Sequence, residues 1–141
     1  MRNSKKVKGF TLVELIVVIA IIGVLAALII PNLVAYLENS NVRKLEGNAK
    51  TVFTAASSHA SECKVSGAAS PHLTAGADYV VAQGDAIFNF LGNDAQLAIT
   101  AGAGQPGGFT ATVRCDADVM PLAVQCTDNT YTGLYPAEFQ W

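Results

Sequence analysis

The most restrictive feature of this 141-residue chain is an apolar run of 21 residues, Phe10 to Ile30, in which Glu14 is the single charged residue. At about 1.5 Å per residue, a helix of this length covers roughly the 30 Å hydrocarbon core of a bilayer. The run is rich in β-branched residues, but backbone polar groups in lipid must bond within their own segment, so a helix is expected. An ionisable group inside a membrane span costs roughly 2.5–3.5 kcal/mol at the bilayer centre, which makes Glu14 a candidate functional residue.

Charge is distributed unevenly along the sequence. Four of the nine basic residues precede the apolar run, and none of the eleven acidic residues does; the four are Arg2, Lys5, Lys6 and Lys8. Residues 10–141 therefore carry five basic and eleven acidic groups, a net charge of −6. The basic cluster predicts that the N-terminus stays in the cytoplasm and the body lies outside. The acidic body argues against nucleic-acid binding through its surface.

Two simple explanations of the N-terminus fit poorly. A secretory signal peptide has an apolar region of about 7–15 residues and a small-x-small cleavage site. The run here is longer and ends Ile29-Ile30-Pro31-Asn32, without such a site. A plain membrane anchor for an exterior domain fits the length but leaves Glu14 unexplained.

Beyond Ile30 the pattern changes from apolar all round to amphipathic. Residues at spacings of three or four form one helical stripe with a single polar member: Val34, Leu37, Asn41, Leu45, Ala49, Val52, Ala56, Ala60 and Cys63. We expect one helix from Thr11 to about Cys63. Residues 10–30 would lie in a bilayer or filament core, and residues 31–63 would pack on a globular head.

Gly23 and Pro31 interrupt the expected helix. Proline cannot donate a hydrogen bond to the carbonyl of Ala27 and crowds that turn, so a kink is expected near residues 27–31.

Residues 64–141 are expected to form the globular head. Residues 66–78 have the composition of a loop, residues 85–91 favour a short helix, and residues 101–108 a flexible turn. Three candidate strands follow, at residues 109–115, 121–126 and 130–135, the first with strict apolar–polar alternation. Short connections favour an antiparallel meander whose apolar face covers the helical stripe, which is an α+β fold.

The segment Gly9-Phe10-Thr11-Leu12-Val13-Glu14-Leu15, behind a basic leader, closely resembles the processing signal of type IV prepilins and pseudopilins. The resemblance covers about residues 5–36, and the long helix behind it is consistent to about residue 63. It implies that a membrane-embedded aspartyl peptidase cuts between Gly9 and Phe10 and N-methylates Phe10. Residues 1–9 would then be a cytoplasmic leader peptide, and Glu14 would be the assembly glutamate. In the family, the stretch matching residues 23–31 can also lose its helix in assembled filaments.

A physical argument supports this role for Glu14. Once the leader is removed, the first basic side chain is Arg43, so the α-amine of Phe10 is the cation nearest to Glu14. If many such helices left the lipid and packed together, the carboxylate would be buried and would need a partner. The amine of a neighbouring subunit would provide one and would fix the axial register between subunits.

The resemblance implies a structural subunit, the major pilin of a type IV pilus, and not an enzyme. Its expected partners are further copies in a helical filament, the prepilin peptidase and N-methyltransferase, an assembly platform and the membrane. It would cross the cytoplasmic (inner) membrane once before assembly and then become part of an extracellular fibre. One alternative is a major pseudopilin of a type II secretion or competence DNA-uptake system. A second alternative is a monomeric membrane-anchored binding domain.

Three cysteines fit an exported domain with one disulfide, and the sequence alone does not choose among their three pairings. Because side chains alternate between the two faces of a strand, Cys115 and Cys126 are both expected on the face that points into the core. Pilins often have a disulfide in their C-terminal region, so the resemblance makes Cys115–Cys126 the first expectation, with Cys63 as the competing partner.

Catalytic and metal sites are not expected. His59 and His72 lack a neighbouring nucleophile pattern and are interpreted as surface or helix-edge residues. Acidic residues at two predicted strand ends, Asp116, Asp118 and Asp128, suggest calcium only weakly because their spacing matches no EF-hand. No cofactor signature and no basic-aromatic groove for nucleic acid are present in the sequence.

Overall fold

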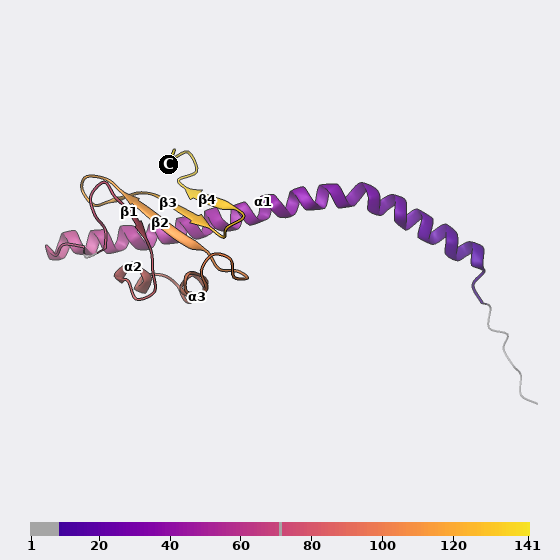
Figure 1. Ribbon diagram of the computed structural model, residues 1–141, viewed down its shortest axis with the longest axis horizontal. Helices are drawn as coiled ribbons and strands as arrows, with labels where there is room; N and C mark the ends of the chain where they lie inside the picture. The colour runs from indigo at the N-terminus through magenta and orange to yellow at the C-terminus, as the bar shows by residue number, and fades with distance from the viewer. Residues whose placement is uncertain (1–8, 71) are drawn as a thin grey trace, which may run out of the picture. The chain divides into compact units, whose positions relative to one another are not determined.

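The computed structural model describes residues 9–70 and 72–141, so the basic residues of the leader lie outside the described residues. The described elements, shown in Figure 1, are α1 (Leu12–Ser66), β1 (Asp78–Val80), α2 (Ala86–Asn89), α3 (Asn93–Ala101), β2 (Thr110–Cys115), β3 (Pro121–Thr127) and β4 (Thr132–Tyr135). The chain divides into two compact units, Met1–Glu38 and Asn39–Trp141.

The first unit contains the apolar part of α1. An 18-residue window of this helix has a mean hydropathy of 3.2, and none of it is buried, so the helix is long and apolar enough to cross a membrane. Leucine, isoleucine and valine side chains are exposed on all of its sides, an arrangement that requires lipid or other helices around it. The helix is continuous through Gly23 and Pro31, and the kink expected there stays a prediction.

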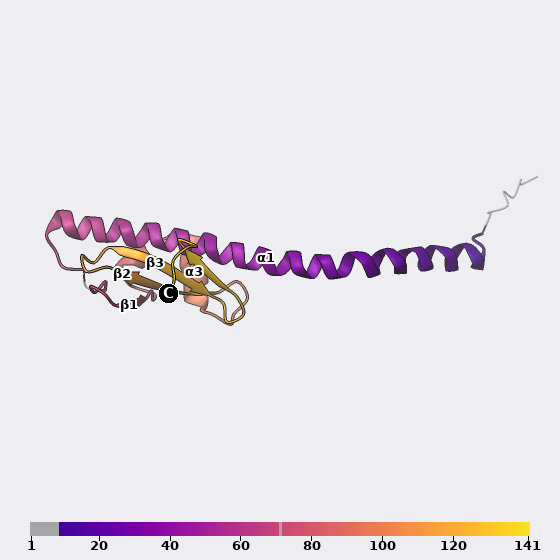
Figure 2. The ribbon, with the colours of Figure 1, turned by 90° about the horizontal axis from the view of Figure 1, so that it is seen from above.

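The second unit is an antiparallel sheet packed on the C-terminal part of α1. Its four strands follow one another in the order β1-β2-β3-β4, and Figure 2 shows α1 running along one face of them. Five members of the predicted stripe are buried against the sheet: Leu45, Ala49, Val52, Ala56 and Ala60. β2 alternates as predicted, with Ala111, Val113 and Cys115 in the core. These observations confirm the α+β fold class.

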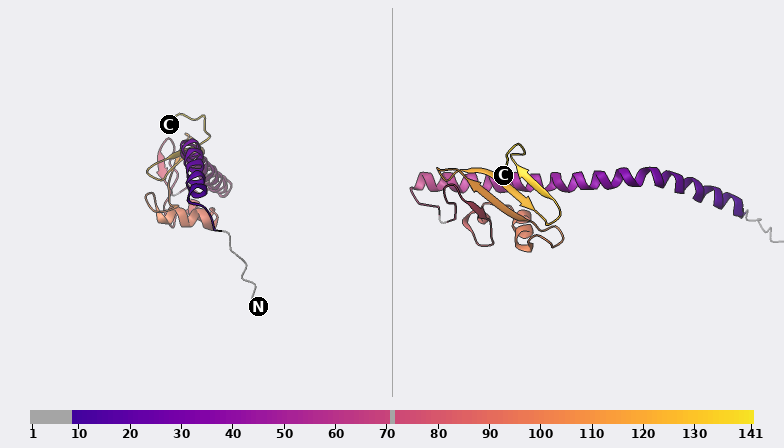
Figure 3. Two further views of the ribbon diagram at one scale, coloured as in Figure 1. Left: turned by 90° about the vertical axis from the view of Figure 1, so that its right-hand side faces the viewer. Right: turned by 45° about the horizontal axis from the view of Figure 1, so that its top comes forward.

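Two elements were not predicted from the sequence. β1 lies at the end of the expected 66–78 loop, where Tyr79 pairs with Val113 across the sheet. α3 follows α2 on the connection from β1 to β2 (Figure 3). The side-chain amide of Gln96 in α3 donates hydrogen bonds to the carbonyls of Phe88 at 2.9 Å and Leu91 at 2.8 Å. These bonds tie the two short helices together.

The Cys115–Cys126 bridge expected from the sequence is not formed, and all three cysteines are free thiols. Both side chains point into the core, as the alternation predicted, but the register separates them. Cys126 lies opposite Ala111, and Cys115 lies opposite Pro121. Four residues along a strand correspond to about 13 Å. A disulfide requires Cα atoms within about 7 Å, so this pairing is wrong for the observed register.

A bidentate ion pair joins β1 to β2. Arg114 donates from Nε to Asp78 Oδ1 at 2.6 Å and from Nη2 to Asp78 Oδ2 at 2.7 Å. The guanidinium also stacks on Trp141, 4.5 Å from the ring centroid. The hydrogen bonds from Arg114 hold the pKa of Asp78 below its usual value. A carboxyl whose pKa is depressed by folding adds stability above its unfolded pKa, and that stability is lost as the pH falls through the folded pKa.

We expect Asp78→Asn to lower the melting temperature at pH 7 by no more than about 4 °C, because exposed ion pairs contribute little. The difference in melting temperature between Asp78→Asn and wild type should persist at neutral pH. It should shrink as the pH falls below about 3.8, the ordinary pKa of an aspartate side chain. Near-UV circular dichroism melts of the full protein in detergent would measure it. Asp118→Asn, at an exposed aspartate, is the control. A difference that stays undiminished in strong acid would contradict the assignment.

Candidate functional site

The Gly9–Phe10 junction lies just before the first turn of α1. Both residues are outside the helix, and the Phe10 side chain is 91% exposed. No described atom lies within 4 Å of the position that a Cβ on Gly9 would occupy. The peptide bond predicted to be cut is therefore in extended, accessible chain, as a protease requires.

Glu14 is held by reciprocal hydrogen bonds to Thr11. Its Oε2 accepts from the Thr11 backbone N–H at 2.9 Å and from the Thr11 hydroxyl at 2.8 Å, while the Glu14 N–H donates to Thr11 Oγ1 at 3.3 Å. This is a capping box, in which a threonine and a glutamate three residues later satisfy each other's backbone donors. The Thr-x-x-Glu spacing could have revealed it in the sequence.

The capping box also gives the carboxylate a direction. Glu14 points back along the chain, toward the residue that follows Phe10. That residue, Thr11, adjoins Phe10, on which cleavage after Gly9 would create a positively charged amine. The same carboxylate can thus close its own helix and present an oxygen beside the N-terminus of the mature chain.

The acidic residues considered as calcium ligands do not meet. Asp116 Oδ1 accepts from the backbone N–H groups of Asp118 and Met120, both at 2.8 Å, in the β2–β3 turn. Asp128 lies beyond the other end of β3, a seven-residue strand that separates the two turns by roughly 20 Å. No group of three or more His, Cys, Asp or Glu side chains within residues 9–70 and 72–141 is placed to hold a metal ion.

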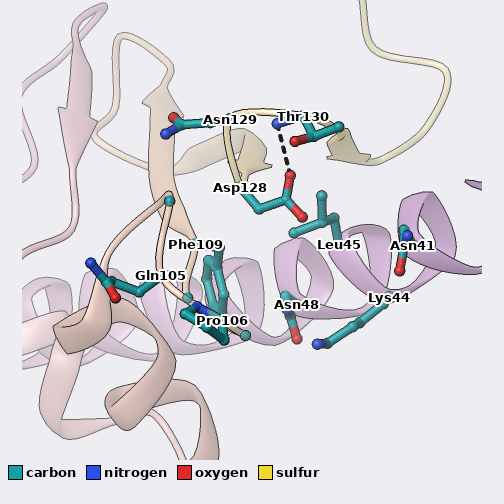
Figure 4. A pocket seen from close by; sticks show the side chains of 13 residues that line it. Asn41, Lys44, Leu45, Asn48, Gln105, Pro106, Phe109, Asp128, Asn129 and Thr130 are labelled. Carbon is teal, nitrogen blue, oxygen red and sulfur yellow. Dashed lines mark hydrogen bonds between the residues drawn. The ribbon is translucent and has the colours of Figure 1, made fainter.

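Asp128 instead shapes a polar cleft of about 420 Å³ between α1 and two loops (Figure 4). Its Oδ1 accepts from Thr130 N–H at 3.0 Å and from Tyr131 N–H at 2.8 Å. These backbone hydrogen bonds, that from Tyr131 first, lower the pKa of Asp128. The carboxylate therefore serves as a turn-forming acceptor.

The structure places the histidines differently from the sequence interpretation. His59 is buried, with 6% of its surface exposed, and its Nε2 lies 3.2 Å from Ser70 Oγ. His72 is partly exposed, with Nδ1 3.8 Å from Asp85 Oδ1. The surface interpretation is wrong for His59, because the turn of α1 that carries it faces the core.

Comparisons with known proteins agree with the N-terminal motif. The family model described as the prokaryotic N-terminal methylation motif matches residues 4–30. The type IV major fimbrial protein FimA of Dichelobacter nodosus is 35% identical over an alignment of 120 residues, gaps included, that covers 73% of this chain and 74% of that protein.

Other relatives match over shorter stretches. The type IV major pilin protein PilA of Myxococcus xanthus is 43% identical over 61 residues, which are 43% of this chain and 28% of that protein. The type II secretion system core protein G of Escherichia coli is 52% identical over 44 residues, 31% of this chain and 30% of that protein. The chain thus spans less than a third of the length of either of these two relatives. No solved structure matches it.

The extended match to the fimbrial protein, together with the methylation motif and the α+β fold, shows that this chain belongs to the type IV pilin family.

Proposed function

We propose that this protein is the major pilin of a type IV pilus, made as a membrane-inserted precursor and polymerised through its N-terminal helix. The observation that carries the proposal is an apolar helix, exposed on all sides, that begins directly after the Gly9–Phe10 junction and contains one carboxylate, Glu14. Such a helix is stable in lipid and, after leaving lipid, among copies of itself.

Processing prepares the chain for assembly. Hydrolysis of the Gly9–Phe10 bond removes residues 1–9, with their four basic side chains, and creates an α-amine on Phe10. N-methylation by the prepilin peptidase keeps the positive charge of that amine. The capping box supports this step, because it closes the helix with Thr11 and Glu14, both of which remain after cleavage.

Assembly then pairs charges between subunits. Glu14 near the cytoplasmic end of its helix can reach the interface while the helix is in lipid, so its cost there is modest. In a fibre the amine of a neighbouring Phe10 would neutralise it and set the axial register. Residues 23–31 are proposed to be the part of the fibre core where helix is weakest, because a glycine and a proline bound this stretch. An assembly platform in the cytoplasmic membrane would add the subunits, and the fibre would extend outside the cell.

The relative in a type II secretion system favours one second candidate, a major pseudopilin, which would share the processing and the assembly chemistry. We prefer the pilus because the alignment to a fimbrial protein covers 74% of that relative, whereas the alignment to the secretion-system protein covers 30%. Electron microscopy of cells with and without the gene distinguishes the two, since a pilin is required for long surface fibres. Chemical cross-linking distinguishes both from a monomeric anchored domain, which would give no ladder of oligomers.

We expect the mature protein to begin at Phe10 and to carry one methyl group, about 14 Da, on its α-amine. Intact mass and N-terminal sequencing of protein extracted from membranes and fibres would measure this. A catalytically inactive prepilin peptidase in the same cells is the control, and should leave residues 1–9 attached. Mature protein that starts at any other residue would contradict the proposal.

A further inference from the structure

The three cysteines have different environments. Cys115 and Cys126 are 2% and 0% exposed, and burial raises their pKa values to about 11 and about 12. These two thiols are therefore protonated and inaccessible. Cys63 is half-buried near the C-terminal end of α1, where it lines a cavity of about 430 Å³. A cavity of this size lies within the range that holds small ligands.

An imidazole lies next to the Cys63 thiol. His59 precedes it by four residues and so shares its face of α1. The Cys63 Sγ is 3.7 Å from His59 Nε2 and 4.0 Å from Nδ1. The ring is almost fully buried and packs at 5.9 Å, centroid to centroid, from the ring of Phe90. Burial on the core side keeps His59 close to the thiol.

Ser70 orients the imidazole. Its Oγ accepts the Leu73 backbone N–H at 3.0 Å and lies 3.2 Å from His59 Nε2. A hydroxyl oxygen has two lone pairs, so Ser70 Oγ can also accept from His59 Nε2–H, which leaves Nδ1, 4.0 Å from the Cys63 Sγ, as the nitrogen that can accept the thiol proton. A nucleophile, a base and a group that orients the base are the three parts of an activated nucleophile. Here they come from one helix and the loop that follows it.

The cavity beside this cluster is largely apolar. Residues 67–69, which are glycine and two alanines, line it together with Leu73 and Val119. Lys64 and Asp118 are the charged residues among its lining. One charge of each sign leaves the cavity neutral, so it suits an uncharged or zwitterionic group attached to sulfur.

We propose that Cys63, with His59 as its base, is a thiol-modification site that forms mixed disulfides with low-molecular-weight disulfides. The Cys63 proton passes to His59, and the thiolate attacks one sulfur of the small disulfide. A bond forms between Cys63 Sγ and that sulfur while the original S–S bond breaks. The leaving thiolate takes the proton back from the imidazolium, so Cys63 is oxidised and one half of the reagent is reduced. This site is independent of the N-terminal assembly segment.

The test uses the full mature protein in detergent, reduced and then incubated with L-cystine, a zwitterionic small disulfide. Peptide mapping by mass spectrometry should find one cysteine adduct, on Cys63. At pH 7 the rate should fall about three- to tenfold in His59→Gln, because glutamine cannot take the thiol proton as the Cys63 sulfur attacks.

Two further variants keep the result interpretable. His72→Gln makes the same change at the histidine outside the cavity and should react like wild type. Ser70→Ala keeps the base but removes the hydroxyl that orients it, and should slow the reaction by less than His59→Gln. Equal rates in wild type, Ser70→Ala and folded His59→Gln would overturn the proposal. So would adducts on Cys115 or Cys126, or a native disulfide between Cys63 and either of them. Fibres formed by His59→Gln would show that pilus assembly does not depend on this site.

Discussion

Replacing Glu14 with glutamine is expected to reduce surface fibres by at least about a hundredfold, while membrane insertion and cleavage after Gly9 continue. The reason is the loss of one partner from the proposed charge pair in the fibre, which would leave the neighbouring amine of Phe10 without a counter-charge. Insertion should not suffer, because a neutral amide is less costly than a carboxylate in lipid. Fibre counts by electron microscopy, with the N-terminal mass of the membrane-bound protein, would measure both effects.

The capping box makes this experiment more specific. Glutamine, like glutamate, can accept the Thr11 N–H in a capping box, so Glu14→Gln preserves the start of the helix and removes the charge. Thr11→Ala does the reverse, because it removes the hydroxyl partner of Glu14 and leaves the carboxylate. Fibres should be close to wild type in Thr11→Ala. If Thr11→Ala lost fibres as completely as Glu14→Gln, helix capping would explain the role of Glu14 and the proposed charge pair would fail.

Local periodicity explains which parts of the fold could be predicted. α1 was predicted to within one residue at its start and three at its end, because its apolar pattern repeats over many turns. β2 was predicted because it alternates over six residues, whereas alternation is broken in β3, where Ala123 and Val124 are both buried. β1 has three residues, too few for a period of two to be visible, and its partner is more than 30 residues away in sequence.

Features that depend on register and packing could not be predicted in the same way. Parity placed Cys115 and Cys126 on one face of the sheet, but the hairpin register separates them along the strands. His59 was interpreted as a surface or helix-edge residue, and its burial could not be predicted because the sequence does not tell how far the sheet and the adjoining loop extend around α1. The capping box was within reach of the sequence, since it needs only Thr11 and Glu14 at the correct spacing.

Gly133 in β4 lies directly against the backbone of α1. A Cβ built there would lie 2.2 Å from the backbone N of Glu46, 2.2 Å from the carbonyl carbon of Leu45 and 2.6 Å from the Leu45 Cβ. Glu46 and Leu45 meet this Cβ with backbone atoms that cannot rotate away. Any side chain at 133 must therefore move β4 away from the helix, and the Val124 and Cys126 contacts of its neighbour β3 would be disturbed with it.

We expect Gly133→Ala to destabilise the head by about 3 kcal/mol or more, the upper end of the range for an overpacked core, and to lower its melting temperature by more than about 10 °C. Near-UV circular dichroism melts of the full protein in detergent would measure the loss of tertiary structure. Gly47→Ala is the matched control, because it adds the same methyl group to α1, the helix that Gly133 contacts, at a position where nothing lies within 4 Å. An alanine inside a helix favours folding over glycine, so Gly47→Ala should raise stability by about 0.5–1 kcal/mol. The two substitutions should thus have opposite signs, and a Gly133→Ala protein that melts like wild type would mean that β4 does not pack on α1 at this register.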